Sequence, residues 1–216
     1  TNPTLATFAS AGKVIFRITA KAENKEKCIE LITPVREELI RRFGKENAYL
    51  VDSGNVEDKV AQLLLEKKLT ISVAESLTGG LVSSKLISYP GISGSYLEGF
   101  VTYSNESKIK TLGVKKETLD KYGAVSEETA KEMAYGAALV SGSDLGVSTT
   151  GIAGPDGGSK EKPVGLVYVC VYYKGKYEVK KINSSGSREI IRERAAVTAL
   201  DLVRTCIERY EDTLSS

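Results

Sequence analysis

The sequence predicts an α/β protein, a mixed sheet with helices on both faces, preceded by a small α+β domain. In most of the chain, short β-like segments alternate with amphipathic helical segments, the pattern of a sheet covered by helices. Residues 164–182 form two apolar strands joined at Lys174 and Gly175, which indicates an antiparallel hairpin. The first part of the chain holds a strand, a helix and a strand. We therefore expect two domains, residues 1–54 and residues 55–216.

The elements of the smaller domain follow from its apolar pattern. Residues 13–21 alternate apolar and polar side chains, which predicts a half-buried strand. Residues 24–44 carry apolar side chains at helical spacing, with Pro34 expected to kink or break the helix and Gly44 to stop it. Residues 48–52 form the second predicted strand.

The larger domain is predicted element by element in the same way. Ser126 is expected to cap one of its helices, because a serine side chain accepts a hydrogen bond from the free N–H groups of a first turn. The predicted helices cover residues 55–69, 79–89, 105–113, 126–142 and 187–210, and the predicted strands cover 69–74, 99–104 and 145–150, followed by the hairpin.

Composition excludes several kinds of catalysis. The chain has no histidine, which excludes a Ser-His-Asp triad, a Cys-His pair and a histidine-ligated zinc site. Cys28, Cys170 and Cys206 are isolated in the sequence, so we expect buried, reduced thiols and no metal site. A hydrolytic reaction would have to take its base from lysine, tyrosine or a carboxylate.

Charge and hydropathy limit the expected cellular location and the expected kinds of partner. The apolar runs are too short to span a bilayer and no signal peptide is evident, so we expect a cytoplasmic protein without membrane contact. The chain begins at Thr1 without a methionine, and an excised piece of a longer protein is expected. The net charge of +2 comes from interspersed signs, so nucleic acid is not an expected partner.

Polar and glycine residues follow three predicted strands, at the point where each strand ends. In open α/β sheets, ligands bind in the crevice beyond the carboxyl ends of the strands. Glycine pairs at 79–80 and 157–158 would let backbone N–H groups approach an anion, although such turns are also common as simple connectors. If the three strands are parallel neighbours, one crevice is shared by Glu75, Ser76, Thr78, Tyr103, Asn105, Lys108 and Thr150.

Several separate motifs resemble those of a known family. The segments, in order, are "AESLTGG", "PGISGSYLEGFVTYSNESK", "GAVSEETAKEMA", "TGIAGPDGG" and "KPVG". Their order and spacing resemble the C-terminal domain of the competence/damage-inducible CinA proteins, over residues 56–205. That family includes the PncC-type nicotinamide mononucleotide deamidases. The first domain resembles the KH-like middle domain of long CinA proteins.

The resemblance implies an activity and a set of site residues. It implies hydrolysis of the carboxamide of nicotinamide mononucleotide, giving nicotinate mononucleotide and ammonia, by a Ser/Lys pair without metal or cofactor. The family pattern assigns Ser93 as the nucleophile, Lys108 as the base and Tyr103 as an orienting or donating group. Arg188 is expected to bind the substrate phosphate. The full expected binding set is Glu75, Ser76, Thr78, Gly79, Gly80, Asn105, Thr150, Gly151, Gly154, Gly157 and Arg188.

Spacing leaves the choice of nucleophile open. Ser93 precedes a predicted strand and Lys108 follows it, and five or six extended residues span roughly 17–20 Å. Ser76, at the end of a neighbouring strand, is better placed by geometry and is the second choice. Residues 149–158 are expected to form one pocket wall, such that valine at Gly151 or Gly154 impairs binding without unfolding the protein.

Other functions and partners also remain open. The main alternative is a nucleotide-sensing or protein-binding module whose pocket does not turn over. RNA binding by the KH-like domain is not expected, because residues 1–54 contain no G-x-x-G loop. That domain is expected to pack between domains or subunits, and the resemblance implies a homo-oligomer.

Overall fold

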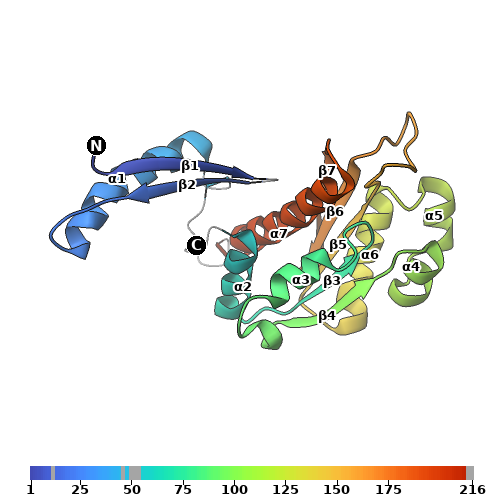
Figure 1. The fold of residues 1–216 in the computed structure, drawn as a ribbon. Helices are drawn as coiled ribbons and strands as arrows, with labels where there is room; N and C mark the ends of the chain where they lie inside the picture. Colours follow the sequence, from blue (N-terminus) through green and yellow to red (C-terminus); the bar gives the residue numbers. More distant parts are fainter. Residues whose placement is uncertain (11–12, 45–46, 49–54, 213–216) are drawn as a thin grey trace. The chain divides into compact units, whose positions relative to one another are not determined.

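The chain forms two compact units, Thr1–Asn55 and Val56–Ser216 (Figure 1). The structure is a computed structural model, and it describes residues 1–10, 13–44, 47–48 and 55–212. Each unit has its own packing and is described by itself.

The first unit is a β-hairpin with one long helix. Strand β1 (Thr4–Ser10) pairs antiparallel with β2 (Lys13–Thr19), and α1 (Lys25–Phe43) follows. Strand β1 was not predicted. Pro34 lies inside α1 without ending it, so the expected break of the helix is wrong. The expected stop is confirmed, because Gly44 is the C-cap residue of α1, with a φ of 82°. The predicted strand 48–52 falls, apart from Ala48, outside the described residues.

The second unit contains a five-stranded mixed sheet in the order β4-β3-β5-β6-β7 (Figure 1). Strands β3 (Ile71–Glu75), β4 (Tyr96–Val101) and β5 (Leu145–Gly151) are parallel neighbours. Strands β6 (Leu166–Tyr173) and β7 (Lys176–Asn183) continue the sheet in antiparallel fashion. The predicted mixed sheet is confirmed, and the carboxyl ends of three strands lie side by side.

The hairpin between β6 and β7 turns where the sequence indicates. Tyr173 pairs with Lys176, which leaves Lys174 and Gly175 as a two-residue connection. Both have positive φ, 49° and 75°, the backbone that a tight hairpin turn with the right-handed strand twist requires.

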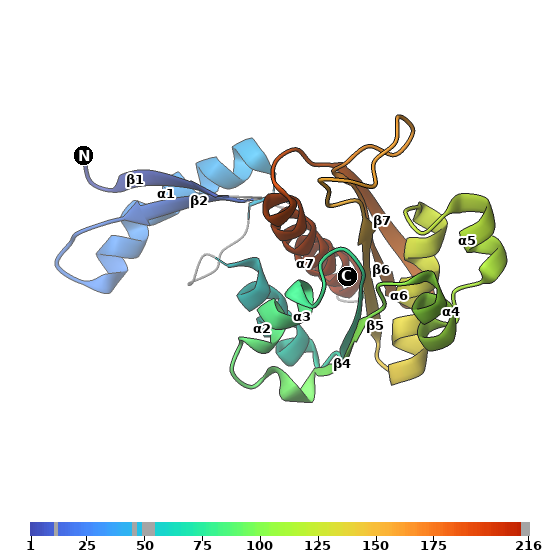
Figure 2. The ribbon, with the colours of Figure 1, turned by 45° about the vertical axis from the view of Figure 1, so that its right-hand side comes forward.

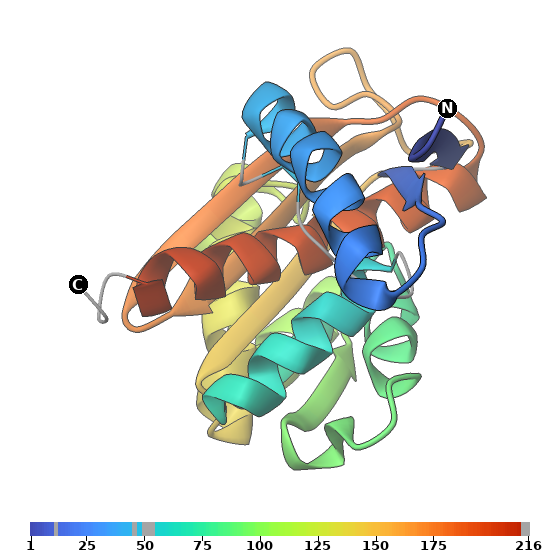
Figure 3. The ribbon, with the colours of Figure 1, turned by 90° about the vertical axis from the view of Figure 1, so that its left-hand side faces the viewer.

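Helices cover both faces of the sheet (Figures 2 and 3). One face carries three helices, α2 (Val56–Lys67), α3 (Leu81–Ile87) and α7 (Arg188–Asp212). The other face carries α4 (Asn105–Leu112), α5 (Lys116–Tyr122) and α6 (Glu127–Ser141), of which α5 was not predicted. A short 3-10 turn, Ile92–Gly94, leads into β4. No helix among the described residues is long and apolar enough to cross a bilayer.

The core lies between the sheet and its helices. Helix α6 packs against β3, β5 and β6, because its alanine-rich face permits a close approach to the sheet. Cys170 and Cys206 are buried free thiols and Cys28 is a partly buried one. Burial raises the pKa of Cys206 to about 12 and raises that of Cys170 as well, so both thiols are unreactive near neutral pH.

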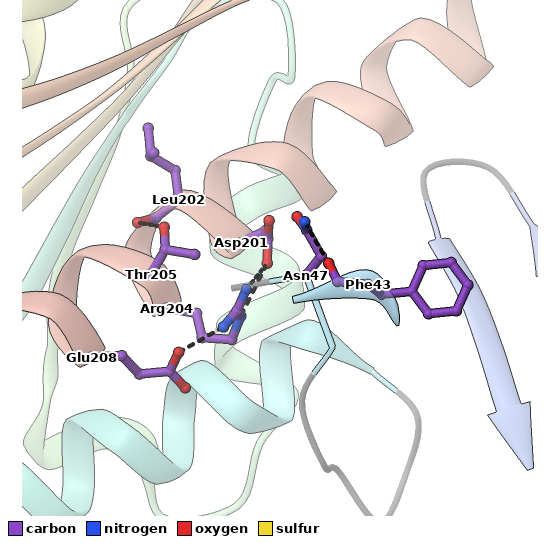
Figure 4. Close-up of polar contacts among 7 residues, drawn as sticks. All are labelled: Phe43, Asn47, Asp201, Leu202, Arg204, Thr205 and Glu208. Carbon is purple, nitrogen blue, oxygen red and sulfur yellow. Dashed lines mark hydrogen bonds and ion pairs between the residues drawn. The ribbon is translucent and has the colours of Figure 1, made fainter. Parts of the chain in front are cut away.

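A buried arginine on α7 is paired within its own helix (Figure 4). Arg204 is fully buried, and it donates to Asp201 at 3.0 and 2.8 Å and to Glu208 at 2.6 Å. A buried cation is tolerated when carboxylates on adjacent turns compensate its charge. Figure 4 also shows the end of α1, where the Asn47 amide donates to the Phe43 carbonyl at 2.9 Å.

Candidate active site

A pocket of about 210 Å³ lies at the carboxyl ends of the parallel strands. Two of its lining residues directly follow β3. The connection from β4 to α4, the end of β5 and the start of α7 supply half of the others. This is the crevice that the strand pattern predicts. Its lining residues are Ser76, Leu77, Tyr103, Lys108, Ala124, Val125, Thr150, Gly151, Ala153 and Arg188.

Ser76 and Lys108 meet inside this pocket. Ser76 directly follows β3, and Lys108 lies on α4, whose N-cap Ser104 accepts a hydrogen bond from the Ser107 N–H. Lys108 Nζ lies 3.2 Å from Ser76 Oγ. Nζ also donates to the Thr102 carbonyl at 2.8 Å and to the Tyr103 carbonyl at 3.2 Å.

These contacts suit a neutral amine. A neutral lysine has two N–H bonds and one lone pair, and two carbonyls accept the two N–H bonds. The remaining direction on Nζ faces the Ser76 hydroxyl. In the neutral form, with both N–H bonds on the Thr102 and Tyr103 carbonyls, the lone pair of Lys108 is directed at the Ser76 hydroxyl.

Burial favours the neutral form of Lys108. Lys108 is 1% exposed, and the partners of its Nζ among the described residues are a serine hydroxyl and two carbonyls, with no carboxylate. Desolvation lowers the pKa of Lys108 to about 8, while the negative charge of Glu106 acts in the opposite direction. A lysine with a pKa near 8 can serve as a general base close to neutral pH.

The loop after Ser76 is held from inside by Glu75. The Glu75 carboxylate accepts hydrogen bonds from the N–H groups of Gly80, Val82 and Ser83 at 2.9–3.1 Å, and from the Ser83 hydroxyl at 2.6 Å. Glu75 is fully buried. Its expected role in substrate binding is therefore corrected, because both carboxylate oxygens are occupied in fixing the loop to the start of α3.

Thr78, Gly79 and Gly80 also shape the loop and do not line the pocket. The Thr78 hydroxyl is buried and shares a 2.7 Å hydrogen bond with the Thr149 hydroxyl. Gly79 and Gly80 adopt φ values of 59° and 93°, a region that strains any residue with a Cβ. The three positions predicted to bind substrate instead turn the chain from β3 into α3.

The far wall of the pocket is built on the end of β5. Thr150 is buried, and its hydroxyl donates to the Ala124 carbonyl at 2.7 Å. Gly151 lies next to it, where a Cβ would approach the Leu166 carbonyl oxygen within 2.7 Å. Both residues line the pocket as predicted, and Gly151 is required by the close approach of β6.

Arg188 and Tyr103 meet on the lining of the pocket. Arg188 begins α7, and its guanidinium donates to the Gly154 carbonyl at 2.8 Å and to the Tyr103 hydroxyl at 3.3 Å. Tyr103 is 64% exposed. The pair therefore presents a fixed cation at a solvent-accessible part of the site, where an anionic group of a ligand can be bound.

Comparison with known proteins assigns both units to one family. The model of the CinA C-terminal domain matches residues 53–207, and that of the damage-inducible protein CinA KH domain matches residues 1–47. The chain belongs to the CinA family. The predicted resemblance is thereby confirmed.

Relatives of this CinA chain are found among clostridia. Competence-damage inducible proteins from Clostridium kluyveri and Clostridioides difficile are both 54% identical to it, over 94% and 97% of this chain. The matches cover 50% and 51% of those proteins. The chain thus spans about half the length of the curated relatives it matches.

Solved structures confirm the CinA fold of the second unit. A CinA superfamily protein from Klebsiella pneumoniae has a TM-score of 0.69 at 30% identity, covering 71% of this chain and 96% of its own. A competence/damage-inducible protein from Agrobacterium tumefaciens has a TM-score of 0.67 at 37% identity, covering 74% and 99%.

The structure does not bring Ser93, the first choice of nucleophile, to Lys108. Ser93 is an exposed residue of the turn before β4, whereas Lys108 follows that strand. The six residues of β4 span about 20 Å, so the two side chains lie at opposite ends of the strand. Ser76, the second choice, is the serine that contacts Lys108.

Other expected residues of this CinA domain lie outside the pocket lining. Asn105 is an exposed first residue of α4, and Gly157 is an exposed turn residue with φ 87°. Gly154 acts through its carbonyl, which accepts from Arg188. Among the described residues, no three side chains of Cys, Asp or Glu form a group that could hold a metal ion.

The site residues expected from the sequence do not include Ala124, Val125 or Arg192. The first two line the pocket from the connection between α5 and α6. Arg192 Nε and Nη2 donate to backbone carbonyls of the loop after Ser76. A signal for Arg192 was present, because it follows Arg188 by four residues and so lies on the same face of the last helix.

Proposed function

We propose that this chain is a serine/lysine amidohydrolase that converts nicotinamide mononucleotide into nicotinate mononucleotide and ammonia. The observation that carries the proposal is the contact of 3.2 Å between Lys108 Nζ and Ser76 Oγ in the pocket at the strand ends. The lowered pKa of Lys108 and its orientation by two carbonyls support it. The substrate follows from the resemblance of the motifs to the PncC-type deamidases.

In the first half of the reaction, neutral Lys108 takes the proton of Ser76 as Oγ forms a bond to the carboxamide carbon. The carbonyl oxygen becomes an oxyanion. The ammonium of Lys108 then donates its proton to the amide nitrogen, the carbon–nitrogen bond breaks, and ammonia leaves. The nicotinoyl group remains on Ser76 as an ester.

In the second half, Lys108 is neutral again and takes a proton from a water molecule that attacks the ester carbon. The carbon–oxygen bond to Ser76 breaks, and Lys108 returns the proton to Oγ. Nicotinate mononucleotide is released and the serine is regenerated. The sequence of steps consumes one water, releases one ammonia and requires no cofactor.

Two further groups contribute binding in this proposal. Arg188 would contact the phosphate, because a guanidinium forms paired hydrogen bonds with phosphate oxygens. Tyr103 shares a hydrogen bond with Arg188 and would orient it. Recognition of the phosphate outside the reacting centre places the carboxamide against Ser76.

The proposal is tested by ammonia release from nicotinamide mononucleotide with EDTA present. Ser76→Ala and Lys108→Met should each lower kcat at least about 1000-fold, because each removes a partner of a covalent mechanism. Ser93→Ala is the matched serine control and should retain kcat within about twofold, since an exposed serine outside the pocket is expected to be neutral. Loss of turnover in Ser93→Ala with retention in Ser76→Ala would contradict the proposal.

A further inference from the structure

Arg192 lies on α7, one turn after Arg188, and contacts the loop that carries Ser76. Its Nε donates to the Leu77 carbonyl at 3.0 Å, and its Nη2 donates to the Thr78 carbonyl at 2.6 Å. These are the two residues that follow Ser76. A planar guanidinium bound to two successive carbonyls fixes their orientation as well as their position.

The carbonyl directions determine where the N–H groups of the same loop point. A trans peptide is planar, and its N–H is directed opposite to its C=O. The Leu77 carbonyl shares a peptide plane with the Thr78 N–H, so the bond from Arg192 fixes the direction of that donor. Among the described residues, the N–H groups of Leu77 and Thr78 donate no hydrogen bond. Of the two residues, Leu77 lines the pocket, whereas Thr78 is fully buried.

Most other tethers bind other parts of the loop, although the Leu81 N–H also donates to the Thr78 carbonyl at 3.3 Å. Glu75 binds the N–H groups from Gly80 onward, and the Thr78 side chain binds Thr149. Gly79 turns the chain with φ 59° and adds no side chain to hold it. Of the tethers described, the one that binds the peptide joining Leu77 to Thr78 comes from Arg192.

We propose that Arg192 is a positioning residue for the nucleophile loop. It holds the Leu77 and Thr78 carbonyls, and with them the segment that begins at Ser76, so that the free N–H of the pocket-lining Leu77 stabilises the negative charge that develops on the carbonyl oxygen of the substrate. The inference rests on the proposed function, because it requires an oxyanion at Ser76. Preorganised donors act mainly in the transition state, so loss of Arg192 lowers kcat more than it raises KM.

The first test compares Arg192→Ala and Arg192→Lys with Arg194→Ala by ammonia release. Arg194 is a matched control, because it lies on the same helix, is also partly buried, and binds the Ser185 carbonyl at 2.8 Å. Arg192→Ala should lower kcat on the order of 100-fold, with KM within about threefold, as for loss of an oxyanion donor. Arg192→Lys should recover part of the loss, and guanidinium added to Arg192→Ala should do the same. An equal kcat in the Arg192→Ala and Arg194→Ala variants, or a change confined to KM, overturns the inference.

The second test measures the rate at which a fluorophosphonate labels Ser76, which needs no amide substrate. Slower labelling of Arg192→Ala than of Arg194→Ala supports the inference, even if the unaltered chain releases no ammonia and the proposed substrate is wrong. Equal labelling rates overturn the inference even if ammonia is released. An unaltered chain that is neither labelled nor active overturns both proposals. If Arg192→Ala does not fold, Arg192→Lys replaces it in both tests.

Discussion

The rate of ammonia release should rise with pH through the pKa of Lys108 and level off above it. The proposed base acts only as a neutral amine, and burial lowers its pKa to about 8. Below that pH the side chain is an ammonium ion and cannot take the proton of Ser76. Above it the amine is free and a further rise in pH adds little.

The expected change follows from the fraction of neutral amine. With a pKa of about 8, this fraction is roughly 9% at pH 7 and 90% at pH 9, a tenfold rise in kcat/KM. A lysine at the ordinary value of 10.5 would be about 0.03% neutral at pH 7. The buried environment therefore increases the available base about 300-fold at pH 7.

The assay is kcat/KM for ammonia release between pH 7 and pH 10. Glu106→Gln provides an internal check, because the Glu106 charge raises the pKa of Lys108 and its removal should shift the inflection to lower pH. A profile that is flat from pH 7 to pH 9, or that rises only near pH 10.5, would refute the role given to Lys108. A shift of the inflection to higher pH in Glu106→Gln would refute the electrostatic argument.

Three further outcomes are expected. The pKa of Lys108 is lower in the folded chain than in the unfolded chain, so the unfolded state binds more protons between pH 8 and pH 10.5. The free energy of unfolding should therefore rise with pH in this range, by at most about 3 kcal/mol. Urea unfolding at pH 7.5 and pH 10 should show this rise in the unaltered chain, and an equal rise in Lys108→Met would exclude Lys108 as its source. Glu75→Gln should destabilise the fold by about 1–3 kcal/mol, since an amide cannot satisfy all of the donors that meet the carboxylate. Urea titration measures this change, and an unchanged midpoint and slope would contradict the role of Glu75. Arg188→Gln should raise KM for nicotinamide mononucleotide about 10-fold or more with little change in kcat, whereas turnover of the riboside, which lacks the phosphate, should not respond. Equal effects on both substrates would show that Arg188 does not bind the phosphate.

The position of the pocket could be predicted from the sequence, because it depends on a rule about strand ends. Polar residues after three neighbouring parallel strands must gather at one edge of the sheet. Ser76, Lys108, Thr150 and Tyr103 are placed in this way, and all four line the pocket. The same rule favoured Ser76 over Ser93, since Ser93 precedes its strand.

The separate roles of the residues at this edge of the sheet could not be predicted. Residue type does not show whether a carboxylate faces a ligand or its own backbone, and Glu75 faces the N–H groups of its own loop. The spacing from Arg188 places Arg192 on the same helix face, but its contacts with main-chain carbonyls of a loop distant in sequence have no sequence signature. Such contacts depend on tertiary packing.

The glycines of the segment 149–158 also have contacts that depend on tertiary packing and could not be predicted from the sequence. Valine at Gly151 was expected to impair binding without unfolding, but a Cβ there would lie 2.7 Å from the Leu166 carbonyl oxygen. At Gly154, a Cβ would lie 2.6 Å from a methyl of Val164, on a backbone with φ 75°. Both substitutions would strain the fold, so neither separates binding from stability.

The environment of Lys108 bears on the choice between an enzyme and a binding module. A lysine that is buried without a carboxylate partner lowers the stability of the fold at neutral pH, by an amount on the order of 3 kcal/mol for a pKa of about 8. A methionine of similar length would avoid this cost. A pocket that only binds a nucleotide has no use for a buried amine that contacts two carbonyls and a serine. Destabilising groups of this kind concentrate where a reaction needs a shifted pKa. Both hypotheses predict that Lys108→Met is more stable than the unaltered chain and still binds. The amidohydrolase hypothesis predicts ammonia release by the unaltered chain and none by Lys108→Met, whereas the binding-module hypothesis predicts none by either.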